Sequence, residues 1–379
     1  MEKKIKQKKS NPIAAFLWKN KRRRAKNFYF ILTVITVVFA AAMAFINDKL
    51  SLMETGDNLS SQMTQQLYDE EEMEIMSAID SAGSLNDYLY QWANNGGTLY
   101  SSKNVLNILL AGLDSKDALE NGGRADSLIL VSLNKKTGKI NMTSFFRDTW
   151  TYMNIGGQDR YAKLNSSYFY GGSTALIDTI EKNFKIDIDY YVAVDFSSFV
   201  DIINALGGIT VEVQEYEANY INKTTKYTIE SGPAVKLTGR QALVFARIRK
   251  SDSDSDVSRT RRQRQVIESF IKSAKDASLS QLNDALDMLF KYVKTDMTKM
   301  QILSYGTQAI TNGWITYDIE QLTLSDKDVF TTGYVGNNSV VFMDFPLAAQ
   351  RLQTAIYGDS NIELPDDRVK LFSLIKRFT

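Results

Sequence analysis

Apolar residues fall into short runs separated by polar or glycine residues over much of the chain. Three such runs lie at 105–111, 128–133 and 140–146. Apolar runs of this length, bounded by turn-forming residues, are typical of buried β-strands. Lys135-Lys136-Thr137-Gly138 separates the second run from the third and predicts a hairpin turn. The pattern therefore predicts three neighbouring strands early in the folded part of the chain.

Helical spacing of apolar residues alternates with further strand patterns after residue 170. The spacing predicts helices at 174–184, 196–206, 238–249, 258–274, 279–293 and 298–311, and strands at 190–195 and 209–213. Ser173 is a candidate cap for the first helix, and Gly207-Gly208 closes the second. Strands mixed with helices in one stretch predict a single α/β domain with a layered core.

One apolar run is long enough to cross a bilayer. Phe28 to Ile46 holds 19 residues without a charge, and a helix of that length spans roughly 28 Å. Eleven basic side chains and one acid precede it, so the positive-inside rule predicts a single-pass anchor with a cytoplasmic N-terminus and an extracellular domain. A cleavable signal peptide is the alternative, because Ala42-Met43-Ala44 has the small-x-small form of a cleavage site. The length of the run favours the uncleaved anchor.

These patterns divide the chain into five parts. They are a basic cytoplasmic tail at 1–27, a transmembrane helix at 28–46, an extracellular stalk at 47–103, a folded domain at 104–358 and a C-terminal tail at 359–379. The tail at 1–27 has a net charge of +10 and the rest of the chain −9, which together give the overall +1. Histidine and cysteine are both absent. Their absence excludes a Ser-His-Asp triad, a thiol nucleophile, a His/Cys zinc site and a disulfide.

Two aspartates stand at the ends of the first two predicted strands. Asp114 directly follows the first strand, and Asp126 directly precedes the second. Carboxylates at one edge of a sheet suit a hard cation such as Mg²⁺, which takes its remaining ligands from water and phosphate. Both residues taken alone are also consistent with loop caps. Arg147-Asp148 ends the third strand and by itself is consistent with a surface ion pair.

The strongest signal is a concentration of arginine. Residues 240–264 contain seven arginines and one lysine against three aspartates. Arginine forks match phosphate oxygens bidentately, so the cluster indicates an anion site, with a solvated basic face as the alternative. The glycine pairs in the chain lack the spacing and the lysine of a P-loop. Nucleic acid is not expected as a partner, because the predicted domain is acidic overall and lies outside the membrane.

At these residues the chain resembles the LytR-CpsA-Psr family of bacterial membrane-anchored phosphotransferases. The matching segments, in family order, are NILLAGLDS (107–115), GRADSLILVSLN (123–134), TSFFRDT (143–149), KLNSSYFYGG (163–172), YYVAVDFSSFVDIINALGGITVEV (190–213), LTGRQALVFARIR (237–249) and DVSRTRRQRQV (256–266). The order of seven segments makes the resemblance specific. The stretch 214–236 matches little, and its role is open.

The resemblance implies a mixed central sheet sandwiched by helices, with an apolar cleft for a polyprenyl chain. It implies transfer of a teichoic acid or capsular polysaccharide from an undecaprenyl-pyrophosphate carrier to the C6 hydroxyl of peptidoglycan N-acetylmuramic acid. The expected partners are that lipid-linked glycan, the peptidoglycan acceptor and membrane lipid. Polyprenyl-pyrophosphate hydrolysis and non-catalytic polyprenyl-phosphate binding by an envelope scaffold or regulator remain as alternatives.

The resemblance also assigns roles to single residues. The family's metal-binding aspartates fall on Asp114 and Asp126, which would hold Mg²⁺ or, in its place, Mn²⁺. Its pyrophosphate-binding side chains fall on Arg124, Arg147, Arg247, Arg249, Arg259, Arg262 and Gln263. Asp114, Asp126, Arg147 and Arg247 are the expected catalytic residues, and one of the two aspartates is the expected base. Candidate lining residues of the lipid cleft, equally consistent with core packing, are Tyr168, Phe169, Tyr170, Leu176, Ile177, Phe196 and Phe199.

Overall fold

The computed structural model describes residues 83–114, 123–225, 227–248, 255–276, 281, 284, 291–324, 326 and 328–364. The predicted tail and span at 1–46, most of the predicted stalk and the residues after 364 lie outside this set. Among the described residues, no helix has both the length and the apolar composition needed to cross a membrane.

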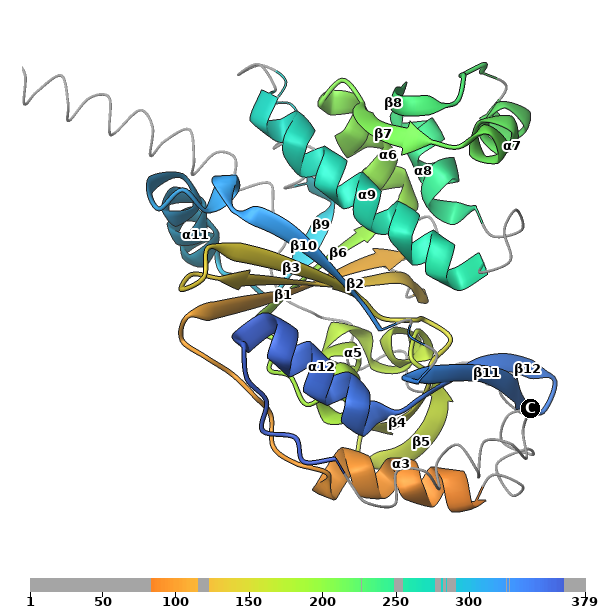
Figure 1. Ribbon diagram of the computed structural model, residues 1–379, viewed down its shortest axis with the longest axis vertical. Coiled ribbons are helices and arrows are strands. Elements are labelled where there is room, and N and C mark those ends of the chain that lie inside the picture. The colour runs from red at the N-terminus through yellow and green to blue at the C-terminus, as the bar shows by residue number, and fades with distance from the viewer. Residues whose placement is uncertain are drawn as a thin grey trace, which may run out of the picture. The chain divides into compact units, whose positions relative to one another are not determined.

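A six-stranded mixed sheet forms the centre of the molecule (Figure 1). Its strands, in spatial order, are β10 (Asp318–Thr323), β3 (Lys139–Ser144), β2 (Ala125–Asn134), β1 (Val105–Leu113), β6 (Tyr190–Asp195) and β9 (Val293–Thr295). β2 pairs antiparallel with β1 and β3, whereas β1–β6 and β3–β10 are parallel pairs. The predicted strands at 105–111, 128–133, 140–146 and 190–195 are confirmed as β1, β2, β3 and β6.

The β2–β3 connection is the predicted hairpin turn. The Oδ1 atom of Asn134 accepts hydrogen bonds from the backbone N–H groups of Lys136, at 3.0 Å, and Thr137, at 3.1 Å. Gly138 follows with a φ of 69°, a left-handed conformation that glycine adopts without steric cost. Local chemistry therefore determines the register of this hairpin, in which Asn134 pairs with Lys139.

One face of the sheet is covered by helices α5 (Ser166–Phe184) and α12 (Phe345–Tyr357), as Figure 1 shows. Helix α3 (Gly83–Asn95) and two hairpins, β4–β5 (Trp150–Ile155, Gln158–Lys163) and β11–β12 (Phe330–Val335, Asn338–Met343), complete this layer. Leu85, Leu89 and Trp92 of α3 are buried in the main core. The end of the segment predicted as a stalk thus packs into the folded domain.

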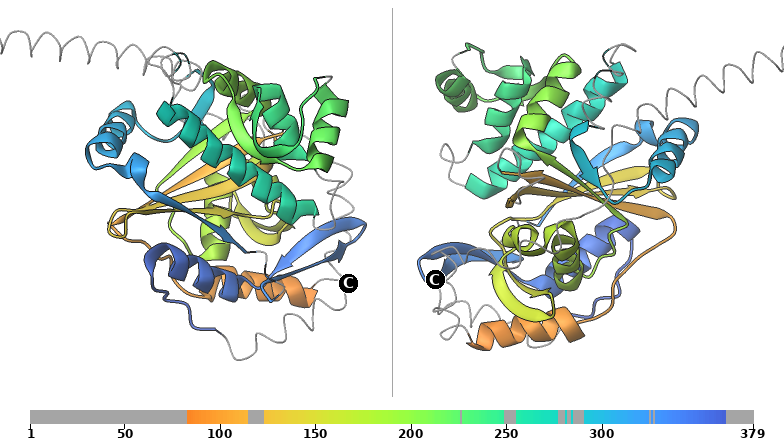
Figure 2. Two further views of the ribbon diagram at one scale, coloured as in Figure 1. Left: turned by 45° about the horizontal axis from the view of Figure 1, so that its top comes forward. Right: turned by 180° about the vertical axis from the view of Figure 1, so that it is seen from behind.

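The opposite face is covered by α6 (Phe196–Ala205), α8 (Gly239–Arg247) and α9 (Ser255–Asp276), as seen from behind in Figure 2. A hairpin of β7 (Ile209–Val213) and β8 (Gly232–Leu237) and helix α7 (Glu215–Thr225) pack on these helices. Thr238 begins α8 with a capping box that includes Gln241. Gly239 lets α8 cross α6 closely, because a Cβ there would lie 2.1 Å from the carbonyl oxygen of Val200.

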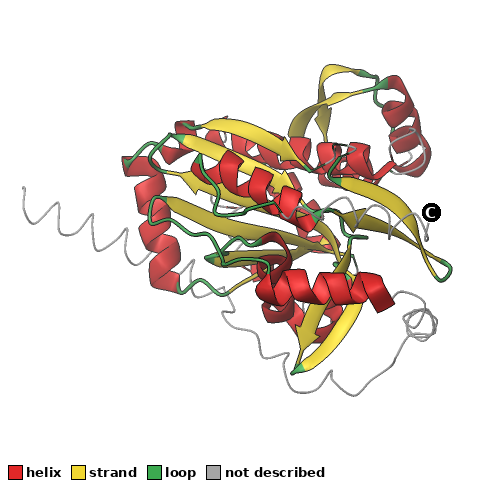
Figure 3. Ribbon diagram, turned by 60° about the horizontal axis from the view of Figure 1, so that its bottom comes forward, coloured by secondary structure: helices red, strands yellow, loops and turns green. Residues whose placement is uncertain are grey.

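Figure 3 shows the strands of the sheet running between helices, the layered α/β architecture that the sequence predicts. Helix α5 consists of two helical pieces joined at a kink, where Gly171 and Gly172 have non-helical φ and ψ angles. The piece after the kink confirms the helix predicted at 174–184, and the piece that begins at Ser166 is additional to the prediction. The predicted helix at 279–293 lies largely outside the described residues, and its end forms part of β9. Helix α11 (Lys299–Thr311) confirms the prediction at 298–311.

Candidate active site

A cavity of about 840 Å³ lies between the sheet and helices α6, α8 and α9. Its floor consists of alternate residues on three adjacent strands, because side chains two apart in a strand share a face. These residues are Ile108 and Leu110 on β1, Ile129 and Val131 on β2, and Val192 and Val194 on β6. The cavity floor is therefore wholly aliphatic over the middle of the sheet.

The roof of the cavity comes from apolar stripes on the three covering helices. Residues three or four apart line up on one side of a helix. The lining residues of this kind include Phe196, Phe199 and Ile203 on α6, Leu243 on α8, and Val266, Phe270 and Ile271 on α9. The predictions that Phe196 and Phe199 line an apolar cleft are confirmed. Tyr168 and Leu176 instead belong to the main core, in the layer under the sheet.

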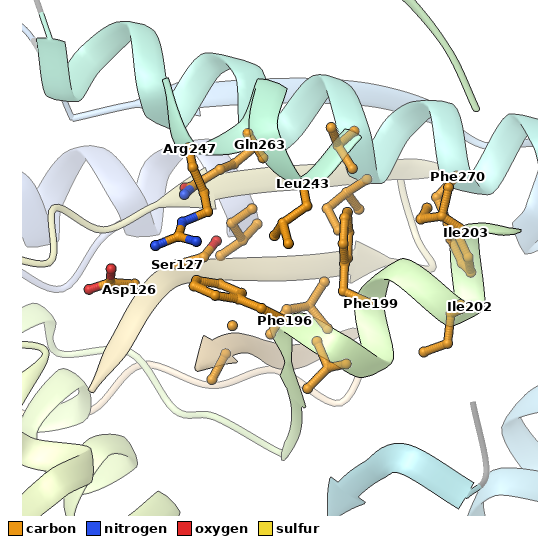
Figure 4. A pocket seen from close by; sticks show the side chains of 18 of the residues that line it. Asp126, Ser127, Phe196, Phe199, Ile202, Ile203, Leu243, Arg247, Gln263 and Phe270 are labelled. Atoms are coloured by element: carbon orange, nitrogen blue, oxygen red, sulfur yellow. The ribbon is translucent and has the colours of Figure 1, made fainter. Parts of the chain in front are cut away.

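Five polar side chains that line this cavity belong to the predicted site: Asp126, Arg147, Arg247, Arg259 and Gln263. Arg240, at the start of α8, lines the cavity as well. In Figure 4, Asp126, Arg247 and Gln263 lie at one end, and Ile203 and Phe270 lie at the other. The cavity therefore matches an amphiphile with an anionic head and an apolar body.

Asp126 reaches the cavity through an irregularity in the sheet. The β1–β2 register passes from Gly112↔Ser127 to Leu113↔Ala125, so Asp126 is an extra residue in β2. Such a bulge re-aims side chains, and both Asp126 and Ser127 line the cavity. Gly112 permits the close approach, because a Cβ there would lie 3.0 Å from the Cβ of Ser127.

Arg147 is held by carboxylates on two sides. Its Nη1 atom donates to Oδ1 of Asp126, and its Nε atom lies 3.3 Å from Oδ2 of Asp148. Asp148 also pairs with Lys163, at 3.5 Å. The side chains of Arg147 and Asp126 are 15% and 16% exposed, so their ion pair is largely removed from water. The guanidinium is thus oriented before any ligand binds, as an anion site requires.

Arg247 ends helix α8 and lies over an aromatic ring. Its Cζ atom is 4.5 Å from the ring centroid of Phe196, a cation–π contact that orients the guanidinium across the cavity. Arg259 and Gln263 lie four residues apart on α9 and share the face that lines the cavity. Two helices that are neighbours in sequence therefore supply Arg247, Arg259 and Gln263, and Arg147 comes from a segment 100 residues before Arg247.

Other predicted site residues lie elsewhere. Among the described residues, neither Asp114 nor Arg124 lines the cavity. Both residues lie at the ends of the β1–β2 loop, beside the bulge. Oδ1 of Asp114 accepts from the backbone N–H of Arg124 at 3.1 Å. Arg262 is fully buried against Glu217, outside the described lining. Arg249 lies outside the described residues.

The two predicted metal ligands have a donor set that fits Mg²⁺. Asp114 follows Leu113, whose strand partner is Ala125, and the bulged Asp126 comes next, so both carboxylates belong to one end of the β1–β2 pair. The described residues contain no group of three or more acidic side chains able to hold a metal ion. Two carboxylates suit a cation that fills its remaining positions with phosphate and water oxygens.

Some lining residues were missed by sequence reasoning. Val266, Ile267, Phe270 and Ile271 of α9 line the cavity; their helical spacing is visible in the sequence, but spacing alone does not show which element they face. Tyr220 and Thr224 on α7 also line the cavity. They come from the stretch 214–236, in which the sequence shows no recognisable motif.

A model of the LytR_cpsA_psr family matches residues 51–355. The chain belongs to this family. The polyisoprenyl-teichoic acid–peptidoglycan teichoic acid transferase TagU of Halalkalibacterium halodurans is 37% identical over 198 residues, which are 52% of this chain and 62% of that protein. The match thus spans less than two thirds of the relative's length.

Solved structures of family members share the fold. TagT bound to LI-WTA is 26% identical, with a TM-score of 0.54 over 68% of this chain and 91% of that chain. The LytR-CPS2A-psr family protein YwtF (TagT) with bound octaprenyl pyrophosphate lipid is 23% identical, with a TM-score of 0.50 over 67% of this chain and 91% of that chain. A mixed sheet flanked by helices is therefore confirmed as the architecture of this chain.

Proposed function

We propose that the chain is a membrane-anchored phosphotransferase, with its N-terminus in the cytoplasm and its domain outside. It moves a glycopolymer from undecaprenyl pyrophosphate to the C6 hydroxyl of peptidoglycan N-acetylmuramic acid. The observation that carries the proposal is the division of one cavity into an aliphatic body and a cationic end. Names of relatives, a teichoic acid transferase and TagT bound to LI-WTA, support the same substrate class.

The reaction requires positioning and charge stabilisation more than a covalent intermediate. The acceptor hydroxyl attacks the glycan-side phosphorus, a new P–O bond forms, and the bond to the bridging oxygen breaks as polyprenyl phosphate leaves. Arg147, Arg247 and Arg259 stabilise the charge that develops on the phosphate oxygens. The aliphatic floor holds the prenyl chain and excludes water around it.

The hydroxyl proton passes to a carboxylate, because the chain has no histidine. Asp126 is the better placed of the two candidates, since it lines the cavity whereas Asp114 closes the adjacent loop. Asp114 and Asp126 would also hold Mg²⁺, which when bound neutralises charge on the pyrophosphate oxygens.

The test compares two arginine variants of the full chain with wild type. Arg247→Ala removes a guanidinium at the cationic end, and transfer should fall by about 100-fold or more. Arg351→Ala is the matched control, since Arg351 pairs with exposed Asp326 and Asp328. It should leave transfer unchanged. Mass spectrometry of peptidoglycan incubated with a polyprenyl-pyrophosphate-linked glycan measures the product.

Three other outcomes would contradict the proposal. Release of phosphate product at the same rate without peptidoglycan would indicate a hydrolase. Tight lipid binding without acceptor-dependent product would indicate a binding protein. Equal losses in both arginine variants would remove Arg247 from the site.

A further inference from the structure

Arg262 is enclosed by side chains and backbone from three helices. Its side chain is 0% exposed. The Nη1 atom donates to Oε1 of Glu217 at 3.1 Å and to the hydroxyl oxygen of Tyr216 at 3.3 Å. The Nη2 atom donates to the backbone carbonyl oxygen of Ile248 at 2.7 Å. One planar fork therefore connects α9 to α7 and to the residue that ends α8.

Glu217 is itself held in place from several sides. It lies in the first turn of α7 and is 0% exposed. Its Oε2 atom accepts from the backbone N–H of Gln214 at 2.9 Å. Its Oε1 atom accepts from the Tyr216 hydroxyl at 3.1 Å and lies 3.3 Å from Nη2 of Arg261. A carboxylate at a helix N-terminus is also favoured by the helix dipole.

The hydrogen bond to Ile248 connects this network to the cationic end of the cavity. Ile248 is the C-cap of α8 and directly follows Arg247. On α9, Arg259 and Gln263 lie on either side of Arg262 in sequence and line the cavity. The Arg262 fork thus joins the two helix segments that carry Arg247 on one side and Arg259 and Gln263 on the other.

We propose that the buried Glu217–Arg262 pair is a positioning device that aligns Arg247 with Arg259 and Gln263. Arg262 then acts through the backbone after Arg247 and makes no contact with the pyrophosphate. The inference rests on the proposed function, because it assigns a positioning role within the same anion site. It also gives a role to α7, in the stretch 214–236, which supplies the carboxylate that holds the fork.

Geometry should matter more than charge at Arg262. Arg262→Lys keeps the positive charge but loses the planar fork that reaches Glu217 and Ile248 together. A misplacement of about 1 Å in a catalytic site can cost on the order of 100-fold in rate. The affinity for octaprenyl pyrophosphate should therefore fall by about tenfold or more in Arg262→Lys. Glu217→Gln should cost a similar factor for a different reason, because it leaves the buried Arg262 guanidinium without its carboxylate partner and loosens the fork.

A double-mutant cycle separates positioning from general destabilisation. Affinity for octaprenyl pyrophosphate is measured by calorimetry for wild type, Glu217→Gln, Arg247→Ala and the double variant. If Glu217 acts through Arg247, its substitution should cost about tenfold in wild type and less than about threefold once Arg247 is gone. Circular dichroism and thermal melting of each variant show that the domain is folded.

Arg264→Lys is the matched control. Arg264 is also a buried arginine of α9, but it donates to Gln321 at 3.0 Å and Ser144 at 2.8 Å, away from α8. It should change the affinity by less than about threefold even where it lowers the melting temperature. Equal costs of Glu217→Gln with and without Arg247 would overturn the inference. If the wild-type protein shows no acceptor-dependent transfer, the proposed function is overturned. The double-mutant cycle on affinity would then still test the positioning role of Glu217 and Arg262.

Discussion

Asp126 shows how one extra residue in a strand can build a binding site. Along a regular strand, successive side chains alternate between the two faces of the sheet. The bulge between Gly112↔Ser127 and Leu113↔Ala125 breaks this alternation, and both Asp126 and Ser127 line the cavity. The carboxylate therefore meets Arg147 at the cavity's edge.

The explanation of this bulge can be tested at Gly112, the residue that permits the close approach of the two strands. Gly112→Ala would place a Cβ 3.0 Å from the Cβ of Ser127, so we expect the free energy of unfolding to fall by about 1–3 kcal/mol. Gly306→Ala is the control, because it lies in helix α11 with nothing within 4 Å of an added Cβ. Its stability should stay the same or rise by up to about 1 kcal/mol. Urea unfolding measures the free energy of unfolding of both variants. An unchanged value in Gly112→Ala would contradict the explanation of the bulge.

Helix α9 shows why a cluster of arginines does not define a site by itself. Arg259 lines the cavity, Arg262 is buried against Glu217, and Arg264 donates to Ser144 under the same helix. The sequence determines the positions of these side chains around the helix relative to one another. It does not determine which side of α9 faces the cavity, because that depends on the elements packed around the helix.

The apolar stripes of α6 and α9 should determine affinity for the lipid body. Phe199→Ala removes an aromatic ring from the cavity wall, so the affinity for octaprenyl pyrophosphate should fall by about tenfold or more, the equivalent of about 1.4 kcal/mol or more. Phe330→Ala is the control, because Phe330 is also partly buried but packs against Phe146 in the main core. That variant should lower stability and leave lipid affinity unchanged, as measured by calorimetry. A larger loss of lipid affinity in Phe330→Ala than in Phe199→Ala would indicate that the lipid does not bind in this cavity.

Charge is distributed unevenly over the whole molecule. The predicted cytoplasmic tail is strongly basic, the remainder is acidic, and the cationic end of the cavity lies within that acidic remainder. One acidic group outside the cavity has a clearly shifted titration. Burial raises the pKa of Glu181 to about 7, with smaller contributions from Asp187 and Asp178.

Glu181 predicts that mild acid stabilises the domain. Its pKa is higher in the folded protein than in the unfolded chain, so the folded state binds the proton more tightly. Stability should fall as pH rises from about 5 to about 8, by about 1 kcal/mol once solvent screening of a partly exposed carboxyl is allowed for. Glu181→Gln keeps an acceptor for the backbone N–H of Ile188, which lies 2.9 Å from Oε1. Urea unfolding of this variant should show a weaker pH dependence; an unchanged dependence would contradict the assignment.

The sequence by itself determined the strands β1, β2, β3, β6 and β7, the family and the types of residue at the site. Continuous apolar runs predicted β1, β2, β3 and β6 because both faces of the sheet are covered, and a buried strand needs apolar residues on both sides. Among the short strand pairs, β7 confirms the strand predicted at 209–213, whereas β4, β5 and β8 correspond to no predicted strand. Their residues are shared between core and surface, and their strand pairing depends on long-range contacts.

Only the tertiary structure decided which predicted residues act together. It brought Asp126, Arg147, Arg247, Arg259 and Gln263 to one cavity, from strands and helices separated by more than 100 residues of chain. It also turned Arg262 to Glu217, on a helix that no sequence motif had marked. The physical reason is that residue type and periodicity are local properties. The direction in which a side chain points toward other elements is set by packing.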